Sequence, residues 1–220
     1  MKYIAPVAAV LLVAAGSIIF DDRRYYFISL AVIIALLAPM VLRFERVNIR
    51  HLVLTAVLAA LAAVSRAAFA PLEQFKPMAS IVIVSGICLG AEGGFAVGAL
   101  GMFASNMYFS QGPWTPWQML AMGLVGFISG LFFAKKRPNR VLLAVYGFLV
   151  TVVVYGVISD ISTVVMTYDK PSFEQVIATL SLGFYFNVIH GISSFVFLLL
   201  IGSGFIKRLD RLVIKYGIAG

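Results

Sequence analysis

Long apolar runs recur along the whole of this 220-residue chain, and they constrain its fold more than any other feature. Each run is roughly 15–26 residues long, which is about what a helix needs to cross the ~30 Å hydrocarbon core of a bilayer. Since no water reaches the backbone there, spanning segments must be helices rather than open sheets. With 62% hydrophobic and only 12% charged residues, a soluble domain is excluded. The sequence predicts an all-α integral membrane protein.

The runs divide into eight expected transmembrane helices. The first resembles a signal peptide, but a second run follows after only Asp21-Asp-Arg-Arg24, which favours a retained helical hairpin. A composition break near Arg43–Arg50 separates this hairpin, domain 1–50, from a six-helix bundle, domain 51–220. The expected helices cover approximately 3–20, 25–42, 51–69, 78–91, 95–110, 117–134, 141–166 and 177–206.

The segment 78–110 is too long for one crossing, because a single helix would extend about 50 Å. We expect a break at Glu92-Gly-Gly94. Two crossings also place Lys2 and the basic clusters at 43–50, 135–140 and 207–215 on one side, where the positive-inside rule makes both termini cytoplasmic. The net charge of +8 then faces anionic lipid rather than nucleic acid.

Three polar, proline-bearing loops fall on the opposite, external side: 70–77, 110–116 and 167–175. The middle loop contains the first part of the stretch Gln111-Gly-Pro-Trp-Thr-Pro-Trp-Gln-Met119, the Trp/Pro motif, which holds both tryptophans of the chain. Its prolines make the connection stiff, and tryptophan favours the headgroup region of a bilayer. The motif is therefore either an interface anchor or the lip of a binding site.

Polar side chains at membrane depth are costly and usually point into a bundle. Arg66 lies near the external end of its helix and Asp160 in the external half of helix 141–166, so the two are placed to pair across the bundle. For Arg66 the alternative is snorkelling to the interface, and for the pair a structural role is as open as a ligand role. Asn187 and His190 are three residues apart and share a helix face. The candidate substrate-binding residues are Arg66, Asn106, Gln111, Trp114, Trp117, Gln118, Asp160, Tyr185, Asn187 and His190.

Small residues recur at helical spacing and predict close helix packing. The glycine pairs are Gly86/Gly90, Gly94/Gly98 and Gly126/Gly130. Helix 51–69 differs because alanines, Ala56 and Ala60 among them, make nearly its whole circumference small. Internal packing and docking of a partner helix are both open for this helix.

Several classes of chemistry are absent from the sequence. There is no G-x-x-x-x-G-K-[ST] phosphate loop and no H-E-x-x-H metal motif, and Cys88 is the only cysteine. We therefore expect no cofactor and no metal. Gly126-Phe-Ile-Ser129-Gly130 is one residue out of register with a nucleophile elbow, so a hydrolase using Ser129 and His190 is a secondary alternative. A ligand-free assembly protein is another.

Three stretches carry a family resemblance: residues 50–60 (Arg-His-Leu-Val-Leu-Thr-Ala-Val-Leu-Ala-Ala), the Gly-Ala-Glu-Gly-Gly-Phe turn at 90–95, and the Trp/Pro motif at 111–119. Over about 51–206 the chain resembles the substrate-specificity subunit (S component) of energy-coupling factor (ECF) vitamin transporters. The resemblance implies a non-enzymatic subunit of a bacterial plasma membrane that binds a vitamin in an external cavity. It also implies a transmembrane coupling subunit and two ATPases as partners, with Ala56 and Ala60 forming the docking face.

Within that family, the chain is most similar to the cobalamin type, with queuosine-type S components near it. A thiamine precursor and folate are further candidate substrates. On this hypothesis we expect Trp114 and Trp117 to stack on or wall in the ligand, and Asn106, Gln118, Asn187 and His190 to supply hydrogen bonds. The three external loops act as lids.

Overall fold

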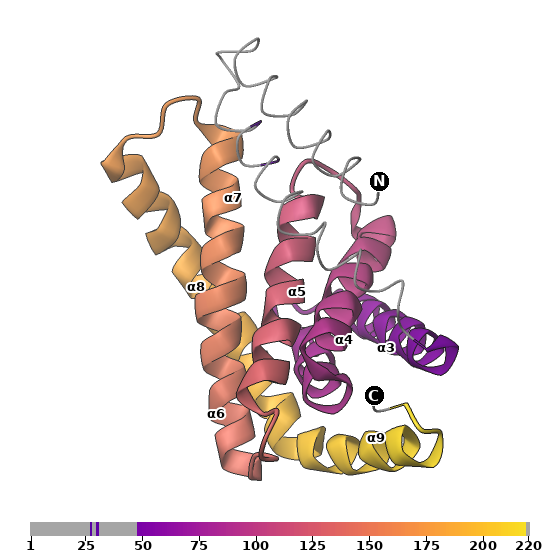
Figure 1. Cartoon of the computed structure of the whole chain (residues 1–220). Coiled ribbons are helices and arrows are strands. Elements are labelled where there is room, and N and C mark those ends of the chain that lie inside the picture. Colours follow the sequence, from indigo (N-terminus) through magenta and orange to yellow (C-terminus); the bar gives the residue numbers. More distant parts are fainter. Residues whose placement is uncertain (1–26, 28–29, 31–47, 219–220) are drawn as a thin grey trace.

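Apolar helices make up the described chain, which comprises residues 48–218 together with Phe27 and Leu30 in a computed structural model (Figure 1). Of the expected hairpin at 1–50, all but Phe27, Leu30 and residues 48–50 lies outside the described part. The predicted total of eight helices includes that hairpin and therefore stays a prediction. The elements are α3 (Ile49–Ala68), α4 (Met78–Phe109), α5 (Thr115–Phe132), α6 (Arg140–Val150), η2 (Thr151–Gly156), α7 (Val157–Thr167), α8 (Phe173–Phe197), η3 (Leu198–Gly202) and α9 (Ser203–Lys215).

Five helical stretches of this part are long and apolar enough to cross a membrane. Two of them are composite, because the single π-helical turns η2 and η3 join α6 to α7 and α8 to α9 without a break. A π-turn accommodates an extra residue and so changes which face of the helix follows it. The all-helical membrane class predicted from the sequence is therefore confirmed for the described residues.

The stretch α4 is two helices that reverse direction at Gly90. Gly90 has φ +82°, the left-handed conformation that glycine adopts without strain. A side chain at Gly94 would collide with the backbone of Gly86, which is impossible in one continuous helix and shows that the two halves lie side by side. The break predicted at residues 92–94 is thus real but occurs at Gly90, because Gly93 and Gly94 are needed as buried helical positions.

Closely packed glycines hold this hairpin against α5. Side chains at Gly86 or Gly94 would meet the backbone of Gly126, and one at Gly130 would meet Ala91. Such contacts bring helix backbones together, as small-residue spacing predicts. The α4 hairpin is the most buried of the spans and packs chiefly on α5 and α3. It forms the centre of the bundle.

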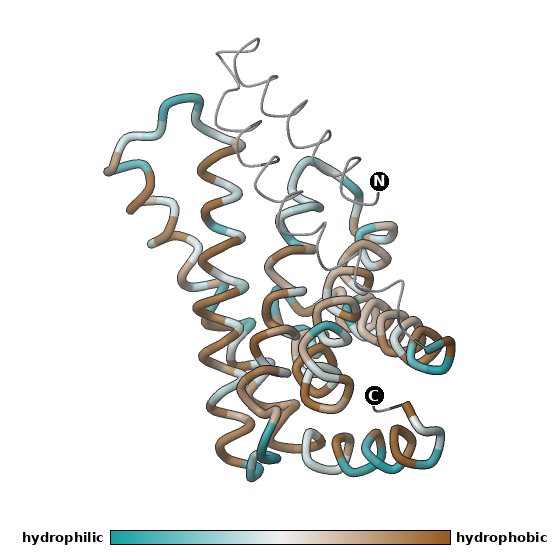
Figure 2. Tube along the Cα trace, in the orientation of Figure 1, coloured by the Kyte–Doolittle hydropathy of each residue, from teal (hydrophilic) through white to brown (hydrophobic). Residues whose placement is uncertain are grey.

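The hydrophilic segments of the described chain gather at the two ends of the bundle. The loop between α7 and α8 is hydrophilic, as are the loop between α5 and α6 and one side of α9 (Figure 2). We call the end with loops 69–77, 110–114 and 168–172 the outer end, and the end with α9 the basic end. At the basic end Arg137 bonds Asp210 at 2.7 Å and also the carbonyl of Ile87, which ties α9 to the α4 hairpin. The orientation in the membrane stays a prediction.

Helix starts at both ends of the bundle carry capping side chains. Asn48 and Asn139 accept from the first turns of α3 and α6. Ser172 and Gln175 form a reciprocal capping box at the start of α8. These caps fix where α8 begins and hence the register of its polar residues.

Candidate functional site

A cavity of about 450 Å³ opens at the outer end between α7 and α8. Gln74 of the α3–α4 loop and Gln118 of α5 close its other side. Its volume lies within the range of small-molecule sites. The full lining is Gln74, Gln118, Tyr155, Ser159, Asp160, Thr163, Thr167, Tyr168, Thr179, Leu182, Gly183, Phe186 and Asn187.

Two helical stripes build the polar walls of this cavity. On η2 and α7 the lining residues Tyr155, Ser159, Thr163 and Thr167 recur every fourth position, and on α8 the residues Thr179, Gly183 and Asn187 do the same. Residues four apart lie on one helix face. Sequence reasoning missed most of these residues because it weighed single polar side chains. The four-residue recurrence of hydroxyl groups in an otherwise apolar run is the signal that could have found them.

Asp160 and Asn187 form the central polar pair of the cavity. Asn187 Nδ2 donates to Asp160 Oδ2 at 2.7 Å, and the Asp160 side chain is buried. Two glycines make room for this pair, since a side chain at Gly183 would strike the Asp160 carboxylate and one at Gly156 would strike the Asn187 amide. The sequence placed both polar residues in the site, and the structure brings them together.

Arg66 does not pair with Asp160, so that expectation was wrong. Its Nη1 donates instead to Ser105 Oγ and to Asn106 Oδ1, both at 2.7 Å. The nearly inaccessible Asn106 then donates through Nδ2 to Gln118 Oε1 at 2.8 Å. Neutral acceptors on the adjacent α4 hairpin satisfy the arginine locally. Of this network only Gln118 reaches the cavity.

The Trp/Pro loop is a compact hydrogen-bonded turn beside the cavity. Thr115 Oγ1 donates to Gln111 Oε1 at 3.0 Å, and Gln111 Nε2 donates to the Phe103 carbonyl at 3.0 Å. Trp114 packs over Gly112 and is 39% exposed. Trp117 packs against a separate cluster around Phe95, Ala99 and Leu120. Neither tryptophan lines the cavity, and Gln118 is the residue of this motif that does.

Two cations share the Phe109 ring close to the outer end. Arg66 Cζ lies 4.5 Å and Lys76 Nζ 4.8 Å from the ring centroid. Burial lowers the pKa of Lys76, the Arg66 charge lowers it further, and Glu73 acts in the opposite direction. Neither cation lines the cavity.

The remaining candidates on α8 point elsewhere. Tyr185 is 67% exposed and lies outside the cavity lining. His190 is buried behind Tyr155, with the two rings edge to face at a centroid separation of 4.9 Å. Neither ring nitrogen of His190 has a hydrogen-bond partner within the described ranges. His190 therefore packs against the lining residue Tyr155 and does not itself line the cavity.

Ser129 shows no catalytic pairing. Its Oγ donates to the Val125 carbonyl at 2.6 Å and accepts from Tyr146 at 3.0 Å. His190 makes no hydrogen bond to it and instead packs on Tyr155. A metal site built from three or more His, Cys, Asp or Glu side chains is also absent from residues 48–218.

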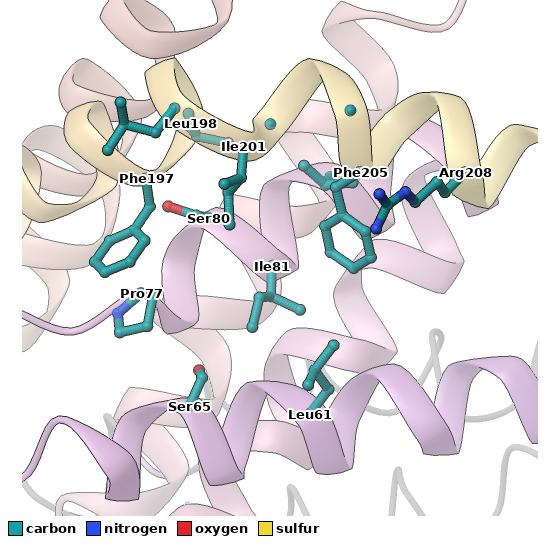
Figure 3. Close-up of a pocket in the computed structure, with 14 residues that line it drawn as sticks. Leu61, Ser65, Pro77, Ser80, Ile81, Phe197, Leu198, Ile201, Phe205 and Arg208 are labelled. Carbon is teal, nitrogen blue, oxygen red and sulfur yellow. The ribbon is translucent and has the colours of Figure 1, made fainter.

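A larger groove of about 560 Å³ lies on another face, between α3, the start of α4, and the α8–η3–α9 stretch (Figure 3). It is lined mostly by apolar side chains, among them Leu61, Ile81, Phe197 and Phe205. Its buried serine, Ser80, already donates to a backbone carbonyl. Ser65 also donates to a backbone carbonyl, which leaves Arg208 as the one polar lining side chain able to orient a ligand, so the smaller cavity is the better candidate site.

The family comparison decides the class of protein. The family described as "ECF-type riboflavin transporter, S component" matches residues 46–210, which include every residue of the cavity lining. This chain belongs to that family. The S-component class inferred from sequence is thereby confirmed at the family level. Since the family is one of transporter subunits, an enzyme is excluded along with the hydrolase alternative.

A second similarity is to a UPF0397 protein of Aliivibrio salmonicida, with 30% identity over 115 residues. The match covers 48% of this chain and 61% of that relative, so the S component described here spans about three fifths of the relative's length. No solved structure matches the chain significantly.

Proposed function

We propose that this protein is the substrate-binding subunit of an ECF-type vitamin importer and that the cavity between α7 and α8 receives the vitamin. The observation that carries the proposal is the convergence of amides, hydroxyls and one carboxylate from three separate parts of the chain, Gln74, Gln118 and the α7–α8 walls, on a single outer-end cavity. A few placed polar groups within a largely apolar protein are typical of a small-molecule site.

For the substrate we propose a flat heterocycle of about the size of a flavin. The family description names riboflavin, and Tyr155 and Phe186 supply aromatic walls for a planar ring. The cobalamin expectation gains no support from the family description. A corrin ring with its nucleotide tail is also far bulkier than a three-ring heterocycle, and the cavity of about 450 Å³ lies in the lower half of the range for ligand sites. Queuosine, a thiamine precursor and folate are the other candidates.

For the partners we propose a transmembrane coupling subunit and two ATPases, with the protein in a bacterial plasma membrane and both termini in the cytoplasm. The sequence contains no phosphate-binding loop, which is in keeping with separate ATPase subunits that supply the transport energy. Ala56 and Ala60 lie on the exposed face of α3 beside Val53 and Val57. Such a small, apolar face lets another helix approach closely.

Purified protein in detergent tests the substrate proposal. We expect riboflavin to co-purify or, when added at about 100 times Kd, to stabilise the fold by about 2.7 kcal/mol. The thermal-shift panel also contains cobalamin, queuosine, a thiamine precursor and folate. Thr163→Trp should abolish the shift by filling the cavity, while Ile161→Trp, on the exposed apolar face of α7, should preserve it. A flat response to the whole panel would overturn the proposed function.

A further inference from the structure

We infer that the cavity selects against anionic ligands and that Asp160 sets this selectivity by accepting a hydrogen bond from an N–H or O–H group of the vitamin. The inference rests on the proposed function and narrows its substrate class. It assigns Asp160 a role in specificity, beyond membership of the site.

The charge balance of the lining is the first step. Among its residues Asp160 carries the only carboxyl group, and no lysine, arginine or histidine accompanies it. Arg66 and Lys76, two cationic side chains of the outer end, lie over Phe109 and outside the lining, and the exposed Lys170 of the α7–α8 loop is also outside it. Arg66 is in addition bonded to Ser105 and Asn106. The cavity thus presents a carboxylate with no cationic partner from the described chain.

The hydrogen bonding of that carboxylate is the second step. Its Oδ2 accepts from Asn187, whereas its Oδ1 accepts from no described residue. The side chain is only 9% exposed, and its open side is the cavity. A carboxylate removed from bulk water is stabilised by donors or by a cation. A ligand that offers a hydrogen-bond donor stabilises the Asp160 carboxylate, whereas a ligand that brings a second negative charge destabilises it.

The construction of the pair is the third step. Gly183 stands where any side chain would displace the Asp160 carboxylate, and Gly156 does the same for the Asn187 amide. The two helices therefore hold both groups in one geometry, with Asn187 orienting the carboxylate by a 2.7 Å bond. This arrangement is a built recognition element, because each partner has its own glycine on the facing helix.

The ligand chemistry follows. The other polar groups of the cavity are neutral amides and hydroxyls, such as Gln74, Gln118 and Thr163, which can bond a polyol or a ring carbonyl. The class that fits is an uncharged or cationic heterocycle with N–H or O–H donors. Phosphorylated and carboxylate-bearing forms are excluded, which disfavours folate and places flavin mononucleotide below riboflavin.

The test compares riboflavin with flavin mononucleotide, which differ by one phosphate, on the full-length protein. We expect the unmodified protein to bind riboflavin at least about tenfold more tightly, because the phosphate brings a second negative charge close to the Asp160 carboxylate. Asp160→Asn retains an acceptor for Asn187 but removes the charge, so riboflavin binding should weaken about tenfold and the preference should shrink. Glu92→Gln, which neutralises an acid beside the Gly90 reversal and outside the cavity lining, is the control and should leave both affinities unchanged.

A second variant separates charge from position. Gly183→Ala keeps the Asp160 carboxylate and its charge, but the added methyl group displaces the carboxylate from its position. Riboflavin binding should therefore weaken, while thermal unfolding without ligand still reports a folded protein. Equal affinities for the two flavins, or an unchanged ratio in Asp160→Asn, would overturn the inference alone. Failure of every vitamin in the panel to bind would overturn the proposed function and the inference together.

Discussion

Asn106 shows how one buried side chain can join two parts of the bundle. It is 1% exposed, accepts from Arg66 of α3 and donates to Gln118 of α5, while it belongs to the α4 hairpin itself. A buried amide that serves both a cation and another amide leaves two groups unsatisfied when it is removed. The cavity residue Gln118 therefore depends on a side chain that does not itself line the cavity.

We predict that Asn106→Ala destabilises the folded protein by about 1–3 kcal/mol, since Arg66 and Gln118 each lose a partner. Denaturant or thermal unfolding in detergent measures the effect. Gln111→Ala is the comparison, because Gln111 bonds at the exposed rim of the loop and should cost clearly less. Equal losses for the two variants would contradict the assigned network.

At the scale of elements, the reversal at Gly90 organises the bundle. It turns one apolar run of 32 residues into two neighbouring helices and presents Gly86 and Gly94 to the backbone of Gly126. The hairpin can then lie at the centre, with α3 on one side and α5 on the other. The outer-end loops and their polar side chains are placed by this packing.

We predict that Gly86→Ala destabilises the bundle by about 1–3 kcal/mol, because its methyl group would press on the Gly126 carbonyl of the neighbouring helix. Gly204→Ala in α9 is the matched control: a methyl group there meets nothing within 4 Å, so the better helix propensity should be neutral or stabilise by up to about 1 kcal/mol. Thermal unfolding of both variants gives the comparison. A neutral Gly86→Ala would show that the glycine contact is looser than described.

At the scale of the whole molecule, the binding cavity and the proposed docking face are separate surfaces. The cavity lies between α7 and α8, whereas Ala56 and Ala60 lie on α3, on the opposite side of the α4 hairpin (Figure 1). A bulky residue on α3 can therefore block a partner without touching the ligand. Binding and transport should be separable by mutation.

We predict that Ala56→Trp and Ala60→Trp leave vitamin affinity unchanged within about twofold but abolish uptake by cells, because the added ring holds a partner helix away. Val153→Trp, at an exposed apolar position on η2, is the control and should support normal uptake. Affinity is measured on purified protein and uptake with labelled vitamin. Normal uptake by both alanine variants would remove the docking role.

The sequence by itself determined the class of the protein and its gross layout. Helix length, hydropathy and charge are local properties, so they predicted membrane helices, the break within 78–110 and the polar loops at one end. The motif resemblance predicted an S component, which the family match confirms. Asp160, Asn187 and Gln118 were singled out because buried polar groups are rare, and all three line the cavity.

Only the tertiary structure decided which of these groups meet. Asp160 pairs with Asn187 rather than Arg66, both tryptophans pack outside the cavity lining, and the chain reverses at Gly90 rather than two residues later. Each outcome depends on the rotation of one helix against another, which glycine contacts and π-turns set over long sequence distances. Composition and spacing tell which face of a helix is polar, but not which helix that face will meet.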